Sequence, residues 1–167
     1  MIRQKIRAFS LVELVIVVVI IGVIAAIAVP RISRGAKGAG ESSLRMNLAS
    51  LRNSIDMYTA EHGGKFPASD TGDDADTLTD QLIKKTDVFG AVGTTAGTHI
   101  YGPYLRGGFP VLPVCANKGK KTVKLVTGTP GHEASGEAWV YSTDTGEIIG
   151  NCADTELDEK GDKYNEY

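Results

Sequence analysis

The chain has 167 residues, which is room for one globular domain and a terminal extension. A composition of 42% hydrophobic and 23% charged residues excludes wholesale disorder, and two cysteines are too few for a disulfide-dense miniprotein. The net charge of −2 gives no reason to expect nucleic-acid binding, which usually needs a basic domain. Any basic function must therefore be local.

Residues 9–29 read FSLVELVIVVVIIGVIAAIAV, an apolar run whose one charged residue is Glu13. A helix of this length rises about 31 Å, close to the roughly 30 Å hydrocarbon thickness of a bilayer. The middle of the run is apolar on every face, whereas a core helix of a small soluble domain carries a polar stripe. We therefore expect a membrane-spanning helix.

The opening MIRQKIRA places three basic residues before the run, which is typical of an export signal. The residues alone leave two cleavage sites open. A secretory signal would be cut after Ala28, at the small residues 26–28, and would release a soluble chain beginning at Val29. Cleavage after Ala8 would keep the apolar run. The length of the run, and Glu13 within it, argue against the first site.

Glu13 needs a partner, because a carboxylate in an apolar span costs on the order of 2–3 kcal/mol near the bilayer centre. If the chain is cut between Ala8 and Phe9, a new α-amino group lies four residues before Glu13. That amine could pair with the carboxylate within one helix or between two staggered helices, where it would fix their register. The alternative is an edge carboxylate that reaches the lipid headgroups.

The stretch AFSLVEL, with its basic leader and apolar continuation, resembles the class III signal of type IV pilins and of type II secretion pseudopilins. The resemblance implies cleavage by a prepilin peptidase after Ala8 and N-methylation of Phe9. It also implies that Glu13 meets the amino terminus of a neighbouring copy during assembly. Gly22 and Pro30 fall where the family has a helix-loosening glycine and proline. The family usually has glycine at the position of Ala8.

Residues 31–42 contain three glycines, which together cost a helix roughly 3 kcal/mol relative to alanine. Pro30 also disfavours helix for Val29, so we expect local loosening there and a weakly specified helix that resumes at Ser43. From there an apolar stripe recurs at helical spacing, comprising Leu44, Leu48, Leu51, Ile55 and Tyr58. The stripe predicts an amphipathic helix that packs against a sheet.

Gly63 and Gly64 predict the end of this helix and leave His62 as a last-turn residue favoured by the helix dipole. Residues 63–108 are rich in glycine, threonine and aspartate and are expected to be mostly loop, with a short helix at residues 77–85.

Three later stretches alternate as strands do: residues 122–126, 139–141 and 147–149. The aspartate and glycine of residues 142–146 suit a tight hairpin turn. We expect a small antiparallel sheet. A long helix packed on such a sheet makes an α+β architecture.

The resemblance extends into this part of the chain. YTAEHGGKFP looks like the helix-end segment of the major pseudopilin, and GPYL followed by Pro110 looks like its strand-entry motif. The implied pilin-like fold has a prepilin leader at 1–8, a transmembrane and assembly helix at 9–30, an amphipathic helix at 31–62, and a globular αβ-loop, sheet and acidic tail at 63–167. VLPVC departs from the Asp-Pro-Trp-Gly-like run of major pseudopilins.

Cys115 and Cys152 are the two cysteines of a chain with an export signal. A disulfide between them would stabilise the fold by very roughly 4 kcal/mol, and two buried free thiols are the alternative.

The histidines lack the spacing of a helical pair of zinc ligands. The tail carboxylates lack the calcium-loop pattern, so we expect no metal and no cofactor; these carboxylates are Asp154, Glu156, Asp158 and Asp162.

The two ends of the mature chain carry opposite charge. Residues 31–52 hold five basic residues and one acidic residue, and residues 151–167 hold six acidic and two basic residues. These segments either attract adjacent copies of the chain or are two solvated surfaces that never meet. A solvated acidic tail is the default expectation.

The residues and the resemblance together predict a structural subunit and no enzyme. The implied setting is the type II secretion pseudopilus, with the chain crossing the inner membrane once and its globular part in the periplasm. Implied partners are copies of itself, other pseudopilins, prepilin peptidase, the inner-membrane assembly platform and membrane lipid. Alternatives are a type IV pilus subunit for adhesion, motility or DNA uptake, and an exported soluble binding module.

Overall fold

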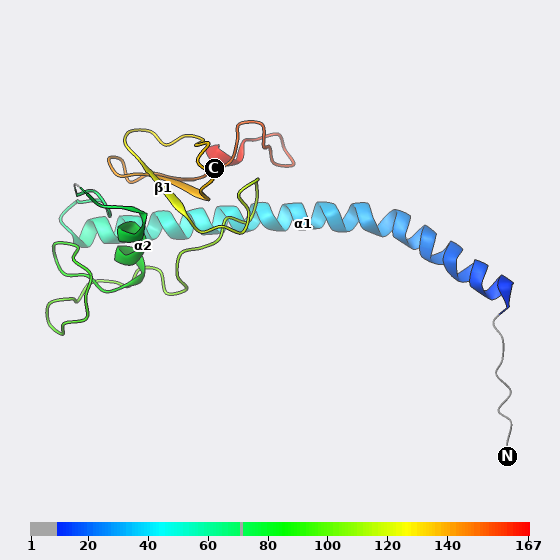
Figure 1. Cartoon of the computed structure of the whole chain (residues 1–167), viewed down its shortest axis with the longest axis horizontal. Helices are drawn as coiled ribbons and strands as arrows, with labels where there is room; N and C mark the ends of the chain where they lie inside the picture. Colours follow the sequence, from blue (N-terminus) through cyan, green and yellow to red (C-terminus); the bar gives the residue numbers. More distant parts are fainter. Residues whose placement is uncertain (1–9, 71) are drawn as a thin grey trace, which may run out of the picture. The chain divides into compact units, whose positions relative to one another are not determined.

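A computed structural model describes residues 10–70 and 72–167, with the main chain only at residues 30, 33 and 34. The helices are α1 (Leu11–Glu61) and α2 (Ala75–Ile83), and a short 3-10 helix, η1, covers Tyr164–Glu166. The strands are β1 (Val123–Val126), β2 (Trp139–Ser142) and β3 (Ile148–Gly150) (Figure 1). The chain divides into two units at Gly38, and α1 contributes to both. A long helix with a small sheet makes the fold α+β, as expected.

Helix α1 runs without interruption through residues 31–42. The expectation that the helix resumes only at Ser43 is therefore wrong. An added Cβ at Gly35 or Gly38 would meet no neighbouring group within 4 Å, so each glycine costs only its intrinsic propensity, about 1 kcal/mol. Because a break would require a second, costly helix nucleus, extending the helix from both sides is favoured.

The apolar stripe of α1 forms one side of the hydrophobic core. Its five members are 0 to 3% exposed: Leu44, Leu48, Leu51, Ile55 and Tyr58. Core residues contributed by the sheet and by α2 include Trp139, Tyr141, Ile148, Leu78 and Leu82. Figure 1 shows the strands, in yellow and orange, beside the C-terminal half of α1. Each buried leucine contributes roughly 1.5–3 kcal/mol, and the predicted packing of the stripe on a sheet is confirmed.

The sheet has three strands in the order β1-β2-β3. Strands β2 and β3 are antiparallel, with Val140 opposite Ile149, and the tight turn between them includes Gly146 at a φ of +71°. Strand β1 is parallel to β2, with Lys124 opposite Val140. The sheet is therefore mixed, and the expectation of an antiparallel sheet is wrong. Two parallel strands need a long crossover connection between them. Residues 127–138, about a dozen residues, are long enough to bring the chain back to the same end of the sheet.

Two side chains of β2 tie loops to the sheet. Trp139 donates from Nε1 to the Pro110 carbonyl at 3.0 Å, and the Tyr141 hydroxyl donates to the Pro67 carbonyl at 3.1 Å. Burial raises the pKa of the Tyr141 hydroxyl, so this group stays protonated and remains a donor. These bonds hold long loop segments that have little secondary structure of their own.

Helix α2 begins before the predicted start at Thr77 because Asp74 caps it. Asp74 Oδ1 accepts the main-chain N–H of Thr77 at 2.8 Å, and the Thr77 hydroxyl accepts the N–H of Asp74 at 3.4 Å. This reciprocal capping box lowers the pKa of Asp74. On the inner face of the helix, Leu78 and Leu82 are fully buried against the core.

His62 closes the C-terminal end of α1 within a cluster of tyrosines. Its ring stacks on Tyr58, with centroids 3.8 Å apart, and lies near the rings of Tyr101 and Tyr104. Nδ1 lies 2.8 Å from the Tyr58 carbonyl oxygen and Nε2 lies 2.9 Å from that of Asp87. The prediction of a last-turn residue held by the helix dipole is incomplete, because His62 is buried and joins α1 to the loop after α2.

The acidic C-terminal segment packs against α1 through Asp158, which is 5% exposed. Its Oδ2 accepts from the Tyr167 hydroxyl at 2.5 Å and lies 3.4 Å from Arg45 Nη2. Its Oδ1 accepts the main-chain N–H groups of Lys160 and Asp162 at 2.7 and 2.9 Å. The default expectation of a solvated tail is therefore wrong at Asp158.

Two further contacts join the same segments. Arg52 Nη2 donates to the main-chain oxygen of Tyr167 at 2.6 Å, and Glu41 Oε1 accepts from the Tyr164 hydroxyl at 3.0 Å. The ring of Tyr164 is buried in the core and draws the segment onto the helix. The basic and acidic segments thus meet within one chain, so the idea that they never meet is wrong.

Candidate functional site

The first segment of α1 has no apolar partner within the described chain. Leu11–Val29 has a mean hydropathy of 3.2, and none of it is buried. Its leucine, isoleucine and valine side chains are 46 to 77% exposed. A soluble core helix would bury one face, so this segment is an exposed apolar surface that needs lipid or another apolar helix. Its length and composition fit a membrane anchor.

Ser10 and Glu13 cap the start of this helix. The Ser10 hydroxyl accepts the main-chain N–H of Val12 at 3.3 Å, and Glu13 Oε2 accepts the main-chain N–H of Ser10 at 3.0 Å. Their S-x-x-E spacing is that of a capping box, and a carboxylate in the first turn interacts favourably with the helix dipole. Because Ser10 directly follows Phe9, the carboxylate lies at the start of the predicted mature chain.

The roles predicted for the other residues of this segment stay predictions. Ala8 and Phe9, with the rest of the leader, lie outside the described residues. Gly22 and Pro30 both lie inside α1. An added Cβ at Gly22 would meet nothing within 4 Å, so no contact within the described chain requires glycine there.

The expected disulfide is present. Cys115 and Cys152 are bonded, with Cα atoms 5.5 Å apart, so they are not free thiols. Glu156 lies beside the bridge and accepts the main-chain N–H groups of Ala116 and Ala153, each at 2.8 Å. Each of these alanines directly follows one of the two cysteines, so the carboxylate stabilises the main chain on both sides of the disulfide.

The two cysteines and three of the four tail carboxylates are engaged in other interactions. The two cysteine sulfurs lie within 4.8 Å of a Glu156 oxygen, but a disulfide has no thiolate to offer a metal. In the tail, Asp154 accepts from Asn165 Nδ2 at 2.9 Å and lies 3.7 Å from Lys163 Nζ. Together with Asp158, these carboxylates hold protein N–H and O–H donors, and so stabilise the fold of the tail itself.

A comparison with protein families matches residues 3–29 to the prokaryotic N-terminal methylation motif. The matched residues cover most of the basic leader, the predicted cleavage point and the apolar segment of α1. The chain carries a class III signal. This signal is typical of pilins and pseudopilins, and it indicates a pilin-like or pseudopilin subunit. None of the curated proteins or solved structures compared with the chain matches it.

The sequence-based predictions missed two kinds of functional residue. Ser10 could have been found, because its spacing from Glu13 is a capping-box signature. The anchoring roles of Glu156 and Asp158 could not, because the groups that they hold include Ala116 and Arg45, far away in the sequence.

Proposed function

We propose that the mature chain is a structural subunit of a filament. The apolar segment of α1 would hold it in a membrane before assembly and pack against other copies afterwards. The observation that carries this proposal is the exposure of Leu11–Val29, which is long enough to span a bilayer and is not buried by the described chain. Lipid tails and neighbouring apolar helices both keep such a surface from water, so transfer between them loses little hydrophobic stabilisation.

Glu13 gives this apolar helix a specific contact. In the proposed filament its carboxylate meets the N-methylated amino group of Phe9 on a neighbouring copy. The helix cap occupies Oε2, and a carboxylate has a second oxygen that can accept the amine. Opposite charges attract strongly where water is excluded. A single ion pair in an apolar layer therefore favours one register between neighbouring helices over others.

The setting that we propose is the pseudopilus of type II secretion, which drives protein export. The chain would cross the inner membrane once and place its globular unit in the periplasm. The disulfide supports this location, because the periplasm is oxidising. Prepilin peptidase, the assembly platform and other pseudopilins would be its partners. A type IV pilus subunit is the second candidate, because pilins and pseudopilins share the methylation motif.

The first test is the chemistry of the amino terminus. Intact-mass analysis and N-terminal sequencing of the chain purified from membranes should show loss of residues 1–8 and one methyl group on Phe9. A chain that begins at Val29 would instead be a soluble exported module and would contradict the proposal. So would a chain that keeps its leader.

A second test separates the two contacts of Glu13. Glu13→Gln keeps an oxygen that can accept the Ser10 N–H but removes the charge, so we expect normal membrane insertion and at least a tenfold drop in filament incorporation, about 1.4 kcal/mol. Ser10→Ala keeps the charge and weakens only the cap, by about 0.5–2 kcal/mol of helix stability. Incorporation is measured by shearing, pelleting and immunoblotting.

The comparison between these variants decides the role of the carboxylate. Near-normal incorporation of Ser10→Ala beside the loss in Glu13→Gln supports the charge contact. Normal incorporation of Glu13→Gln would remove that role and leave Glu13 as a helix cap.

A further inference from the structure

Strand β1 lies at the edge of the sheet and has a neighbour, β2, on one side only. The ladder to β2 uses the carbonyl oxygens of Thr122 and Val126, which accept main-chain N–H groups at 3.1 and 3.0 Å. Because hydrogen-bonding groups alternate along a strand, those of Val123 and Leu125 point to the opposite edge. Among the described residues, no main-chain hydrogen bond outside the ladder reaches them. Strand β1 therefore presents an open edge.

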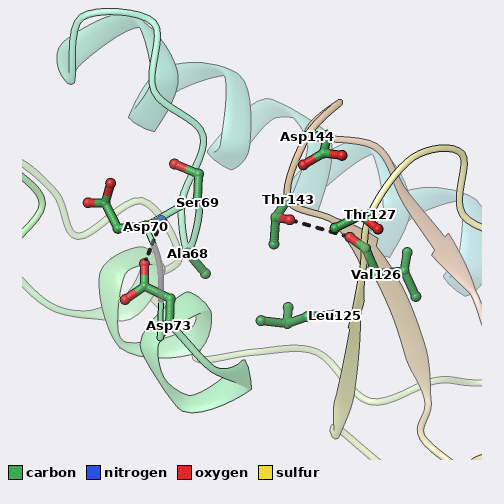
Figure 2. A pocket seen from close by; sticks show the side chains of 9 residues that line it. All are labelled: Ala68, Ser69, Asp70, Asp73, Leu125, Val126, Thr127, Thr143 and Asp144. Atoms are coloured by element: carbon green, nitrogen blue, oxygen red, sulfur yellow. Dashed lines mark hydrogen bonds between the residues drawn. The ribbon is translucent and has the colours of Figure 1, made fainter.

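Two cavities lie beside β1. One of about 470 Å³ lies beside Leu125, with residues 68–70 and Asp73 on its other side (Figure 2). Another of about 530 Å³ lies beside Val123 and faces α2. The residues of α2 that line it are Ala75, Asp76, Thr79 and Ile83. We call the two together the β1 groove, which lies between an edge strand and α2 with its preceding loop.

The walls of the β1 groove are strongly acidic. Five carboxylates line it, against one amine from Lys121: Asp70, Asp73, Asp76, Glu137 and Asp144. One of the five, Asp70, is also paired with Lys65 Nζ at 3.2 Å. Figure 2 shows Asp70 and Asp73 across the first cavity from Thr143 and Asp144. Glu137 has a buried carboxylate oxygen, Oε2, with no hydrogen-bond partner among the described residues. The Ser135 side chain, Lys124 and Lys120 lower the pKa of this carboxyl group, so Glu137 stays ionised and adds negative charge to the wall.

We propose that the β1 groove binds an extended segment of a partner protein that carries lysine or arginine at alternate positions. The segment pairs with Val123 and Leu125 as an additional strand, which is a common way for peptides to bind at an open sheet edge. Its basic side chains reach the acidic walls, and the side chains between them point to the opposite face of the sheet. The charge of the walls selects a basic segment over an acidic one.

The spacing of the groove sets the spacing of the ligand. Residues two apart on a strand lie about 6.6 Å apart and point to the same face. Val123 lines one cavity and Leu125 lines the other, and these two residues are also two apart in the strand. Basic residues at positions i and i+2 therefore place one cation in each cavity. The groove lies within the globular unit, so this inference does not depend on filament assembly.

The test uses the full mature chain in a neutral detergent and the end-blocked, fluorescein-labelled peptide TKVKVKT, with TEVEVET as the acidic control. Fluorescence anisotropy should give a Kd below about 1 mM for the lysine peptide. We expect binding at least about tenfold weaker for the glutamate peptide. Two further lysine peptides are N-methylated on the main chain, one at residues 2, 4 and 6 and the other at residues 3 and 5. Each pattern removes the N–H donors from one edge of the peptide strand, and the two patterns affect opposite edges. A true strand addition loses binding with one pattern only.

The matching variant of the protein is Asp73→Asn with Asp144→Asn. Asparagine keeps the oxygens that accept the N–H groups of Asp70 and Gly128, so the loops should keep their shape. We expect about a fivefold or greater loss of affinity for the lysine peptide. Asp56→Asn removes an exposed carboxylate of α1 outside the groove and should leave the affinity unchanged.

Any of four results would overturn the proposal. Equal binding of the two peptides, or equal effects of the two N-methylation patterns, would mean that strand pairing with a basic segment does not occur. Absence of binding at about 1 mM would mean that the groove does not take such a segment. Weakened self-association of the Asp73/Asp144 variant in sedimentation, with no peptide binding, would assign the groove to a second copy of the chain.

Discussion

Asp158 is a buried carboxylate that accepts hydrogen bonds from the Tyr167 hydroxyl and from the main-chain N–H groups of Lys160 and Asp162. The hydrogen bond from Tyr167 is the main cause that lowers its pKa to about 2, and main-chain N–H groups of residues 160–162 add to it, while desolvation opposes it. Arg45 approaches the same carboxylate from α1. The sequence around Asp158 is polar and typical of an exposed tail, so its burial could not be predicted without knowing that the chain returns to α1.

We expect Asp158→Asn to lower the free energy of unfolding at neutral pH but to have little effect near pH 2. The folded-state pKa of about 2 lies below the unfolded value of about 3.9. The ionised carboxylate therefore stabilises the fold above about pH 4, and this stabilisation is lost as the pH falls towards 2. Urea unfolding of the variant and of the unmodified chain between pH 7 and 2 should show the two stabilities converging.

The control for this measurement is Asp56→Asn, which removes an exposed carboxylate from α1. Its effect on stability should be small throughout the pH range. A difference between Asp158→Asn and the unmodified chain that stayed constant down to pH 2 would contradict the assigned contacts of Asp158.

The helices and strands that could be predicted are those whose sequence pattern lies within one segment of the chain. The stripe ending at Tyr58 has helical periodicity, and Gly63 and Gly64, with φ of +67° and +88°, end α1 as predicted. The direction of β1 has no such signal, because alternation is the same in parallel and antiparallel strands. At the candidate site, Glu13 is conspicuous as a charge in an apolar run, whereas the proposed pairing of Glu13 with Phe9 involves a second molecule.

Residues 31–42 of α1 show how context decides the effect of glycine. Gly35 is exposed, and an added Cβ there would touch nothing within 4 Å, whereas one at Gly40 would lie 3.0 Å from Val114 Cγ1. Gly35→Ala should therefore stabilise the helix locally by about 1 kcal/mol. Gly40→Ala gains the same propensity but must displace a packed side chain, so its net effect should be smaller or opposite.

Amide hydrogen exchange of residues 31–42 in detergent micelles measures this difference. Exchange should slow about fivefold in Gly35→Ala and less, or not at all, in Gly40→Ala. Equal slowing in the two variants would mean that Val114 yields without cost, contrary to the packing that the structure shows.

The whole molecule consists of two units that are stabilised in different ways. The described members of the hydrophobic core begin at Leu44 and end at Tyr167, and all lie after Gly38. The segment Leu11–Val29 is not buried by the part of the chain that the structure describes, and so needs lipid or another apolar helix. The information that folds the globular unit should therefore reside in residues Ala39–Tyr167, and the capacity to assemble should reside largely in the residues before them.

We expect the fragment Ala39–Tyr167 to fold alone, to form the disulfide and to remain monomeric, because it keeps the described core and loses the exposed apolar segment. Circular dichroism, thiol titration and size-exclusion chromatography with light scattering measure these three properties. Within the fragment, Leu48→Ala should cost about 2–5 kcal/mol of stability, as expected for a fully packed leucine. A fragment that associates as strongly as the mature chain would place the main assembly contacts on the globular unit, and the apolar helix would then serve chiefly as an anchor.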